Sequence, residues 1–104
     1  MITSNTARGF RTIEFEDRYN TPCSIQKSSL ATEDAIWFGV DDADPQIMAV
    51  DAKRLGIPTA QTVGWVPYTI PEEVLLSTRM HLTRDQVEEL LPLLQHFVDT
   101  GELP

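Results

Sequence analysis

Apolar residues in the C-terminal part of the chain recur at three- and four-residue spacing, which places them on one face of a helix. The members of this stripe are Val87, Leu90, Leu91, Leu94, Phe97 and Val98. Thr83 and Gln86 have the spacing of a capping box at the helix start, and Gly101 is suited to ending the helix. Pro92 inside the pattern frees the carbonyl of Glu88, so the sequence predicts a kinked helix rather than a broken one.

The first part of the chain has the pattern of strands. Residues 10–16 alternate apolar and charged positions, residues 17–22 have turn chemistry, and residues 23–29 are typical of a returning strand. A hairpin over 10–29 is therefore predicted. Residues 35–40 (AIWFGV) are apolar throughout. We expect this third strand to be buried on both faces, or buried on one face and covered by a second subunit on the other.

A short helix is predicted in the middle of the chain. Asp44 has the character of an N-cap, and Pro45 suits the first helical position. A partial apolar stripe then follows over residues 45–55, and Gly56 can stop it. Residues 57–62 are expected to form a loop.

The remaining segments complete an α+β domain. Residues 64–70 are rich in β-forming residues but contain Pro67, which cannot donate to a ladder, so this strand is expected to be irregular or at an edge. Residues 74–82 are predicted to form another strand. The sequence thus indicates a mainly antiparallel sheet with a C-terminal helix and a short middle helix, in a single domain over 1–104 with a loose N-terminus at 1–8.

Charge limits the classes of partner. The 104 residues carry 16 acidic and 8 basic side chains, a net charge of −8, which argues against general affinity for nucleic acid or anionic membrane. An acidic surface also suits a decoy that imitates DNA, although solubility is the simpler explanation. Only Asp41, Asp42 and Asp44 form a dense acidic cluster.

The sequence offers little for catalysis, for a metal or for a cofactor. His81 and His96 do not stand at ligand spacing with each other or with cysteine, and no glycine-rich phosphate loop or nucleophile elbow occurs. We therefore expect a protein that is not an enzyme and has no cofactor. Cys23, the single cysteine, is expected to be buried, and a lone cysteine without a membrane span or signal peptide fits the cytoplasm.

An anion site is the better candidate. Arg79 and His81 stand two apart in a predicted strand and so point to the same face. Thr83 and Arg84 add the free N–H groups of a helix start and a second guanidinium. The simpler alternatives are surface salt bridges from the two arginines to Asp85, Glu88 or Glu72. For His81 the alternative is a polar residue at the strand end whose hydrogen bonds are satisfied within the protein.

Aromatic residues extend this hypothesis to a nucleotide. Trp65 and Tyr68 lie in the neighbouring run and are able to stack on a base, although core packing is the alternative. Together with Trp37 and Phe38 they also supply much aromatic surface for a small domain. Such a protein often hides this surface between identical copies, so a homo-oligomer is expected.

Two segments carry a resemblance to a known family. FEDRYNTPCSIQKSSLATEDAIWFG and RMHLTRDQVEELLPLLQHFVDTGEL resemble small proteins of bacteriophages and prophages, over residues 9–103. The chain is most similar to the type 1 Thoeris anti-defence proteins. The resemblance implies a sponge that sequesters cyclic ADP-ribose signals, and cyclic oligonucleotides from CBASS defence in some members, without cleaving them. It implies pockets between subunits of a homo-oligomer in the cytoplasm of the infected or lysogenic host.

The resemblance also implies roles for individual residues. Arg79, His81 and Arg84 would face the phosphate groups of the ligand, with Trp65 or Phe38 against an adenine. The acidic net charge departs from what a phosphate sponge suggests, so positive charge is expected to be concentrated locally. The competing hypothesis is an acidic protein-binding inhibitor of a host defence complex, of the anti-CRISPR or DNA-mimic type.

Overall fold

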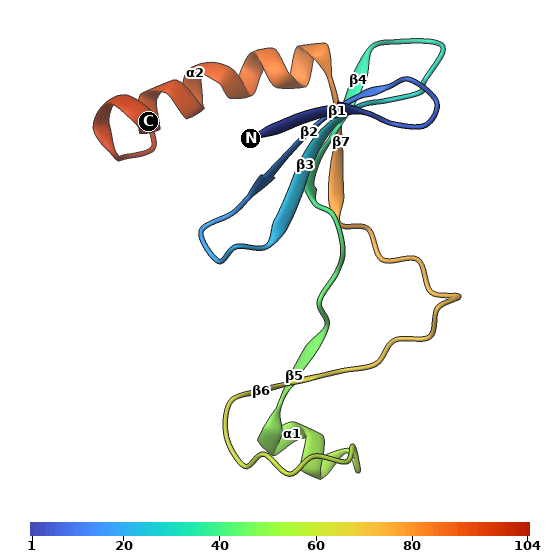
Figure 1. Cartoon of the computed structure of the whole chain (residues 1–104). Helices are drawn as coiled ribbons and strands as arrows, with labels where there is room; N and C mark the ends of the chain where they lie inside the picture. The colour runs from blue at the N-terminus through green and yellow to red at the C-terminus, as the bar shows by residue number, and fades with distance from the viewer. The chain divides into compact units, whose positions relative to one another are not determined.

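The computed structural model describes all 104 residues, which form two compact units. The sheet unit comprises Met1–Asp41 together with Thr78–Pro104, and the second unit comprises Asp42–Ser77. Figure 1 shows the elements of both units along the chain. The predicted class is confirmed: the fold is α+β, with a mainly antiparallel sheet, a C-terminal helix and a short helix.

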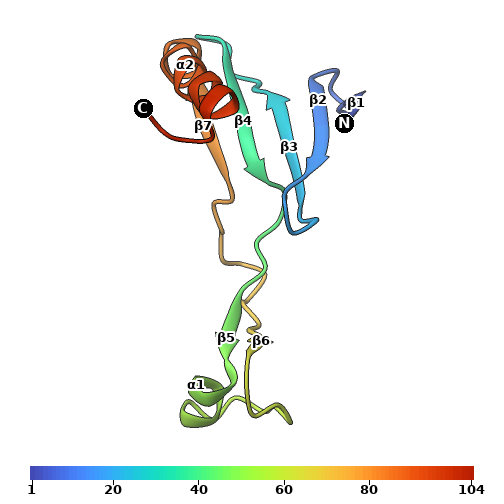
Figure 2. The same cartoon turned by 90° about the vertical axis from the view of Figure 1, so that its left-hand side faces the viewer.

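The sheet unit is built on a five-stranded sheet in the order β1-β2-β3-β4-β7, with every neighbouring pair antiparallel (Figure 2). The strands are β1 Ile2–Asn5, β2 Arg11–Glu16, β3 Pro22–Lys27, β4 Ala35–Val40 and β7 Arg79–Thr83. Four of the five strands follow one another in sequence. The last, β7, returns after the second unit to pair with β4.

The predicted first hairpin is confirmed as β2 and β3. Its turn is held by Asp17, whose Oδ1 accepts hydrogen bonds from the backbone N–H groups of Tyr19 and Thr21 at 2.8 and 3.0 Å. Asn20 adopts a positive φ of 61°, a conformation that asparagine tolerates better than most residues. Local turn chemistry therefore sets the register of this hairpin.

The N-terminus differs from the prediction of a loose segment. Residues Ile2–Asn5 form β1, which pairs with β2 from Ile2 opposite Glu14 to Asn5 opposite Arg11. All four residues of β1 are exposed, so the hydrophobic pattern gave no sign of the strand. Backbone pairing along the open edge of β2 accounts for it.

Residues of the sheet alternate between two faces of different character. Cross-strand partners assign each side chain to a face. The apolar face consists of Ile13, Phe15, Cys23, Ile25, Ile36, Phe38, Val40, Met80 and Leu82. The polar face consists of Thr12, Glu14, Ser24, Gln26, Trp37, Gly39, Arg79 and His81. Strands β2, β3, β4 and β7 thus each contribute side chains to both the apolar and the polar face.

Helix α2 (Arg84–Thr100) leaves the end of β7 and extends to one side of the sheet (Figure 1). The predicted capping box is confirmed: Thr83 Oγ1 accepts from Gln86 N at 3.3 Å, and Gln86 Oε1 accepts from Thr83 N at 3.0 Å. Gly101 ends the helix with a φ of 75°. As predicted, Pro92 lies inside a helix that continues past it. No residue of α2 is buried.

The second unit pairs β5 (Gln46–Met48) with β6 (Trp65–Pro67) beside α1 (Ala49–Arg54). Its core is Ala49, Ala52 and Val66, with Ile47 and Ile57 partly buried against it. The short length of β6 agrees with the expectation that Pro67 makes this strand irregular.

The prediction of a helix over 45–55 is wrong at its start, because residues Gln46–Met48 are a strand. The carbonyl of Pro45 accepts a hydrogen bond from Tyr68 N at 2.9 Å, so the start of the predicted helix pairs with the β6 segment instead. The helix begins at Ala49, and its N-cap Met48 makes no side-chain cap.

The strand predicted over 74–82 is also too long. It begins at Arg79, opposite Gly39, near the end of β4. The last residue of β4, Val40, lies opposite Thr78, so the residues before Thr78 have no strand to pair with. The available partner, rather than β propensity, limits β7.

Candidate ligand-binding face

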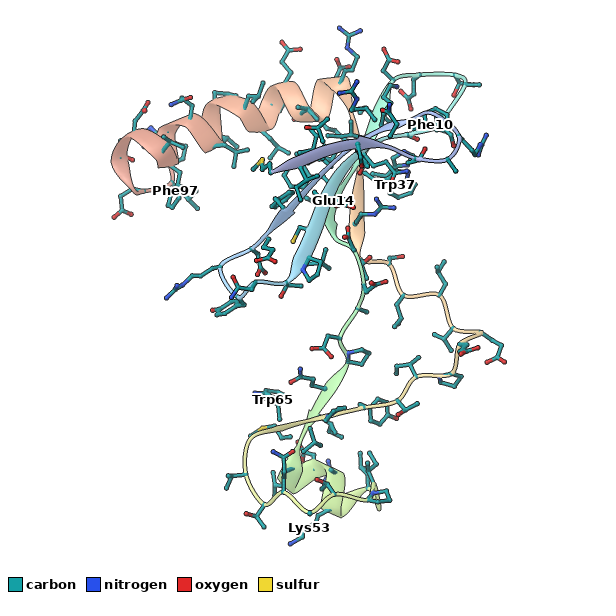
Figure 3. The ribbon with its side chains drawn as sticks, in the orientation of Figure 1. Phe10, Glu14, Trp37, Lys53, Trp65 and Phe97 are labelled. Atoms are coloured by element: carbon teal, nitrogen blue, oxygen red, sulfur yellow. The ribbon has the colours of Figure 1, made fainter.

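The polar face gathers one cation and two aromatic rings on neighbouring strands. Arg79 and His81 lie on the same face of β7, as their spacing predicts. Trp37 of β4 lies between them and the rest of the sheet, opposite His81 in the register. Figure 3 shows Trp37 on the side of the sheet away from α2. The three side chains therefore share a surface that α2 does not cover.

Arg79 is fixed by two hydrogen bonds from a single nitrogen. Its Nη1 donates to Gln26 Oε1 at 3.1 Å and to Ser24 Oγ at 3.3 Å. The guanidinium carbon lies 5.7 Å from the centroid of the Trp37 ring, within the range of a cation–π interaction. The remaining N–H groups of this partly buried guanidinium make no hydrogen bond within the chain, so they are free to bind a ligand.

Ser24 links this arginine to a carboxylate. The buried hydroxyl of Ser24 donates to Asp41 Oδ1 at 2.6 Å while it accepts from Arg79. A hydroxyl has one proton and two lone pairs, so both contacts are compatible. Asp41 is thereby held at the edge of the polar face at the end of β4.

A groove of about 400 Å³ runs over this part of the sheet. It is lined almost entirely by polar side chains: Ser4, Asn5, Thr6, Thr12, Glu14, Ser24, Gln26, Asp41 and Arg79. Hydroxyl and amide groups supply both donors and acceptors. The charged groups are one guanidinium and two carboxylates, so the groove is not a uniformly positive anion site.

His81 stacks on Trp37 with ring centroids 3.8 Å apart and an angle of 6° between the ring planes. Its Nε2 lies 2.9 Å from the hydroxyl of Ser28, a buried residue whose backbone N–H donates to Ala35 O. The ring is therefore positioned by stacking on one side and by a hydrogen bond at its edge. The predicted polar partner of His81 exists, and it is Ser28.

Arg84 does not join Arg79 and His81. Its Nη1 lies 3.7 Å from Asp34 Oδ2, and Lys27 Nζ lies 3.0 Å from Asp34 Oδ1. These residues line a cavity of about 540 Å³ with Ile36 and Leu82, which belong to the apolar face. The cations expected to converge are thus divided between the two faces of the sheet. None of the salt bridges considered as the alternative, to Asp85, Glu88 or Glu72, forms, and the acid that Arg84 meets is Asp34.

The charges at this corner affect the titration of Asp34. The hydrogen bond from Lys27 and its positive charge lower the pKa of Asp34, partial loss of hydration opposes that shift, and Arg84 lowers the pKa further. Thr83 lines the same cavity, but its hydroxyl is engaged in the capping box. Asp34 therefore occupies the position at the helix start where a bound anion was expected.

The other predicted aromatic residues lie elsewhere. Phe38 belongs to the apolar face, where its ring meets Phe15 edge to face with centroids 6.1 Å apart. Trp65 and Tyr68 belong to the second unit and are exposed rather than packed in its core. Within the sheet unit, the aromatic residue beside Arg79 is Trp37.

Sequence reasoning missed Trp37, Gln26 and Ser24 as site residues. Alternation along β4 already places Trp37 and Phe38 on opposite faces of the sheet, so only one of the two can share a face with His81. The choice between Trp37 and Phe38 requires the register between β4 and β7. The sequence does not give this register, because the whole second unit separates the two strands along the chain. Alternation along β3 indicates that Ser24 and Gln26 share a polar face, but it does not indicate that both bind Arg79.

We compared the chain with protein-family models, with curated proteins and with solved structures, and found no match in any of the three. The structure contains no helix that is long and apolar enough to cross a membrane. It also contains no group of three or more histidine, cysteine or acidic residues placed to hold a metal ion. The description of the site therefore rests on the residues of this chain.

Proposed function

We propose that the protein binds a small cyclic nucleotide signal, a cyclic ADP-ribose isomer or a cyclic oligonucleotide, and sequesters it without cleaving it. The observation that carries the proposal is the guanidinium of Arg79, held by Gln26 and Ser24 beside the Trp37 ring at the edge of a polar groove. A group that is already fixed loses little conformational entropy when it binds.

The groups on the polar face match the three parts of a nucleotide. Arginine suits phosphate oxygens because its guanidinium donates bidentately. The stacked rings of Trp37 and His81 offer an aromatic surface for a base. Glu14 and Asp41 are acceptors for ribose hydroxyls, as acidic residues are in dinucleotide sites. No residue of the groove is assigned a catalytic role.

The charge of the groove narrows the ligand class. One arginine stands with two carboxylates in the lining, so a ligand whose ribose hydroxyls outnumber its phosphates fits better than a polyphosphate. A cyclic ADP-ribose isomer has two riboses and one pyrophosphate. This agrees with the resemblance to the Thoeris anti-defence proteins, which also leads us to propose a homo-oligomer in the cytoplasm of a phage-infected bacterium.

Native mass spectrometry tests the proposal directly. The purified chain is measured alone and with a panel of cyclic ADP-ribose isomers and cyclic oligonucleotides. We expect one ligand class to be retained at defined stoichiometry and recovered intact after denaturation. Recovery of a hydrolysed product would rule out sequestration as the mechanism, and retention of no ligand from the panel would rule out the proposed ligand class.

Two arginine variants distinguish the two candidate binding sites, the polar groove at Arg79 and the cavity at Arg84. Arg79→Ala should weaken ligand binding at least tenfold, about 1.4 kcal/mol, because it removes the positioned guanidinium. Arg84→Ala, the matched control, should leave affinity within about twofold because Arg84 lies at the other cavity. The opposite result would move the ligand to the start of α2.

The acidic-inhibitor hypothesis has a separate test. Asp41 lies in the sheet unit and lines the groove proposed for the nucleotide, whereas Asp42 and Asp44 are exposed in the second unit. Charge reversal of Asp42 and Asp44 should leave nucleotide retention unchanged. Loss of anti-defence activity in that variant, with nucleotide retention intact, would favour a protein target instead.

A further inference from the structure

One wall of the polar groove is formed by β1, at the edge of the sheet opposite to β7 (Figure 2). Ser4 and Asn5 of this strand, and Thr6 directly after it, line the groove together with residues of β2, β3 and β7. All four residues of β1 are exposed, and Ile2, its one large apolar residue, is 68% exposed. β1 therefore forms part of the groove without a buried side chain to anchor it.

Backbone hydrogen bonds to β2 hold this strand in place. Thr6 N donates to Phe10 O at 2.7 Å. Bonded and non-bonded positions alternate along an antiparallel pair, so the register makes Ser4 and Ile2 the residues of β1 whose N–H groups face β2. Each of these bonds replaces a bond to water and contributes little net stability. An edge strand held in this way opens more readily than the inner strands of the sheet.

The guanidinium of Arg79 lies closer to β1 than the strand order suggests. Arg79 stands opposite Gly39, which has no side chain, and its guanidinium crosses β4 to bond Ser24 and Gln26 of β3. It is therefore separated from β1 by β2 alone. Neighbouring strands are about 4.8 Å apart, so the groove extends roughly 10 Å from the guanidinium to β1. This width is on the scale of one nucleoside with its phosphate.

The polar groups at the β1 end of the groove are uncharged. The exposed side chains of Ser4 and Asn5 form no hydrogen bond within the chain, whereas the Thr6 hydroxyl accepts one from a backbone N–H of the following turn at 3.1 Å. A hydroxyl and an amide both donate and accept. Glu14 and Asp41 repel a phosphate from this part of the groove. The β1 end thus suits ribose hydroxyls or the edge of a base, and an asparagine amide pairs bidentately with adenine.

We propose that β1 is a wall of the nucleotide site that the ligand itself stabilises. Ser4 and Asn5 bind the nucleoside part of a ligand whose phosphate is held by Arg79, and binding orders the strand. This inference rests on the proposed function, and it adds the position of the uncharged part of the ligand and the segment that responds to it. Because these contacts exist only when β1 is paired, the ligand shifts the population toward the paired strand. By reciprocity, loss of strand pairing lowers the affinity for the ligand.

Amide hydrogen exchange measured by NMR tests the coupling. In the free protein the amides of Ile2 and Ser4 should exchange faster than those of β3. Saturation with a cyclic ADP-ribose isomer or cyclic oligonucleotide that the chain retains should slow both amides at least about tenfold. Ribose 5-phosphate has a phosphate for Arg79 but no base, so it should leave their exchange within about twofold of the free protein.

Native mass spectrometry of the same samples separates the two ways of failing. Retention of a nucleotide with unchanged exchange at Ile2 and Ser4 would overturn this inference and leave the proposed function intact. Retention of no nucleotide from the panel would overturn both.

Substitutions of side chains on the two faces of β1 locate the contacts. The double variant Ser4→Ala, Asn5→Ala should weaken nucleotide binding at least about tenfold, because it removes the polar groups at this end of the groove. Thr3→Ala is the matched control. Thr3 stands opposite Ile13, on the other face of the strand, so its loss should change the affinity by less than about twofold. Wild-type affinity in the double variant, with binding lost in Arg79→Ala, would overturn the inference.

Two proline variants test strand pairing without altering the lining of the groove. Ile2→Pro removes an N–H group that faces β2, and should weaken nucleotide binding about fivefold because β1 is then paired less often. The N–H group of Thr3 points away from β2, and an edge strand tolerates proline at such a position. Thr3→Pro should therefore stay within about twofold of wild type. Equal affinity in the two variants would overturn the coupling between strand pairing and binding.

Discussion

The imidazole of His81 lies parallel to the indole of Trp37 across the β4–β7 pair, with ring centroids 3.8 Å apart. Directly opposite residues in an antiparallel pair are the closest side-chain neighbours in a sheet. Here the contact joins β4 to a strand that returns only after the second unit. The pair therefore stabilises the last strand of the sheet as well as forming part of the candidate site.

Removal of the His81 ring should destabilise the sheet unit. His81→Ala loses the stack and the hydrogen bond to Ser28, so we expect a decrease of about 1–2 kcal/mol in the free energy of unfolding. Urea denaturation followed by tryptophan fluorescence measures it. His96→Ala, on the exposed part of α2, should stay within about 0.5 kcal/mol of wild type. Equal effects in the two variants would mean that the stack contributes nothing.

Gly39 is required by close approach of two backbones. Its φ is 154°, and a Cβ at this position would lie 2.7 Å from Thr78 O and 3.0 Å from Arg79 Cα. Gly39→Ala should therefore destabilise by about 2 kcal/mol or more and shift Arg79. Gly9→Ala, where φ is also positive but no atom lies within 4 Å, should cost only about 1 kcal/mol. Thermal unfolding of both variants measures the two losses of stability, and the difference between them is the cost of the steric clash at Gly39.

Elements defined by local chemistry were predictable from the sequence. The capping box of Thr83 and Gln86 and the terminal Gly101 gave the bounds of α2, and the turn at Asp17 gave the first hairpin. Each of these signals involves residues within a few positions of one another. Their energy does not depend on the rest of the fold, so the sequence alone was sufficient.

Features defined by pairing between distant segments were not predictable. β1 has no hydrophobic signal, β5 replaced the first turn of a predicted helix, and β7 is shorter than its β-forming run. The prediction of which residues gather at the candidate site was incomplete for the same reason. Arg79 and His81 share a face by local alternation, but Trp37 and Arg84 could be placed only from the register of β4 and the exit direction of α2.

Asp34 should make stability depend on acid pH. Its pKa is lowered in the folded state by the hydrogen bond and charge of Lys27. A depressed carboxyl pKa contributes stability that is complete above the ordinary value near 3.9 and is lost as pH falls through the folded value. Lys27→Met should return the pKa of Asp34 toward its ordinary range, and Arg84→Met should change it less. Titration of the Asp34 carboxyl by NMR checks both, and an unchanged pKa in Lys27→Met would contradict the assignment.

Cys23 should be unreactive in the folded protein. It is 5% exposed, as expected from the sequence, and burial is the main cause that raises the pKa of its thiol, with the charge of Asp17 adding to the effect. Because the thiolate is the reactive form, both factors slow modification. A thiol reagent such as DTNB should react slowly in buffer and rapidly in denaturing urea. Equal rates in the two conditions would show that the β2–β3 hairpin opens freely.

Pro92 should limit the stability of α2 without contributing to its apolar stripe. It lies on the polar side of the helix, so Pro92→Ala restores a backbone hydrogen bond while leaving the stripe intact. We expect greater helical circular dichroism and a gain of up to about 3 kcal/mol in the free energy of unfolding. Thr83→Ala should act oppositely, by about 1 kcal/mol, because it removes one half of the capping box. A loss of stability in Pro92→Ala would show instead that the bend produced by proline is part of how α2 packs.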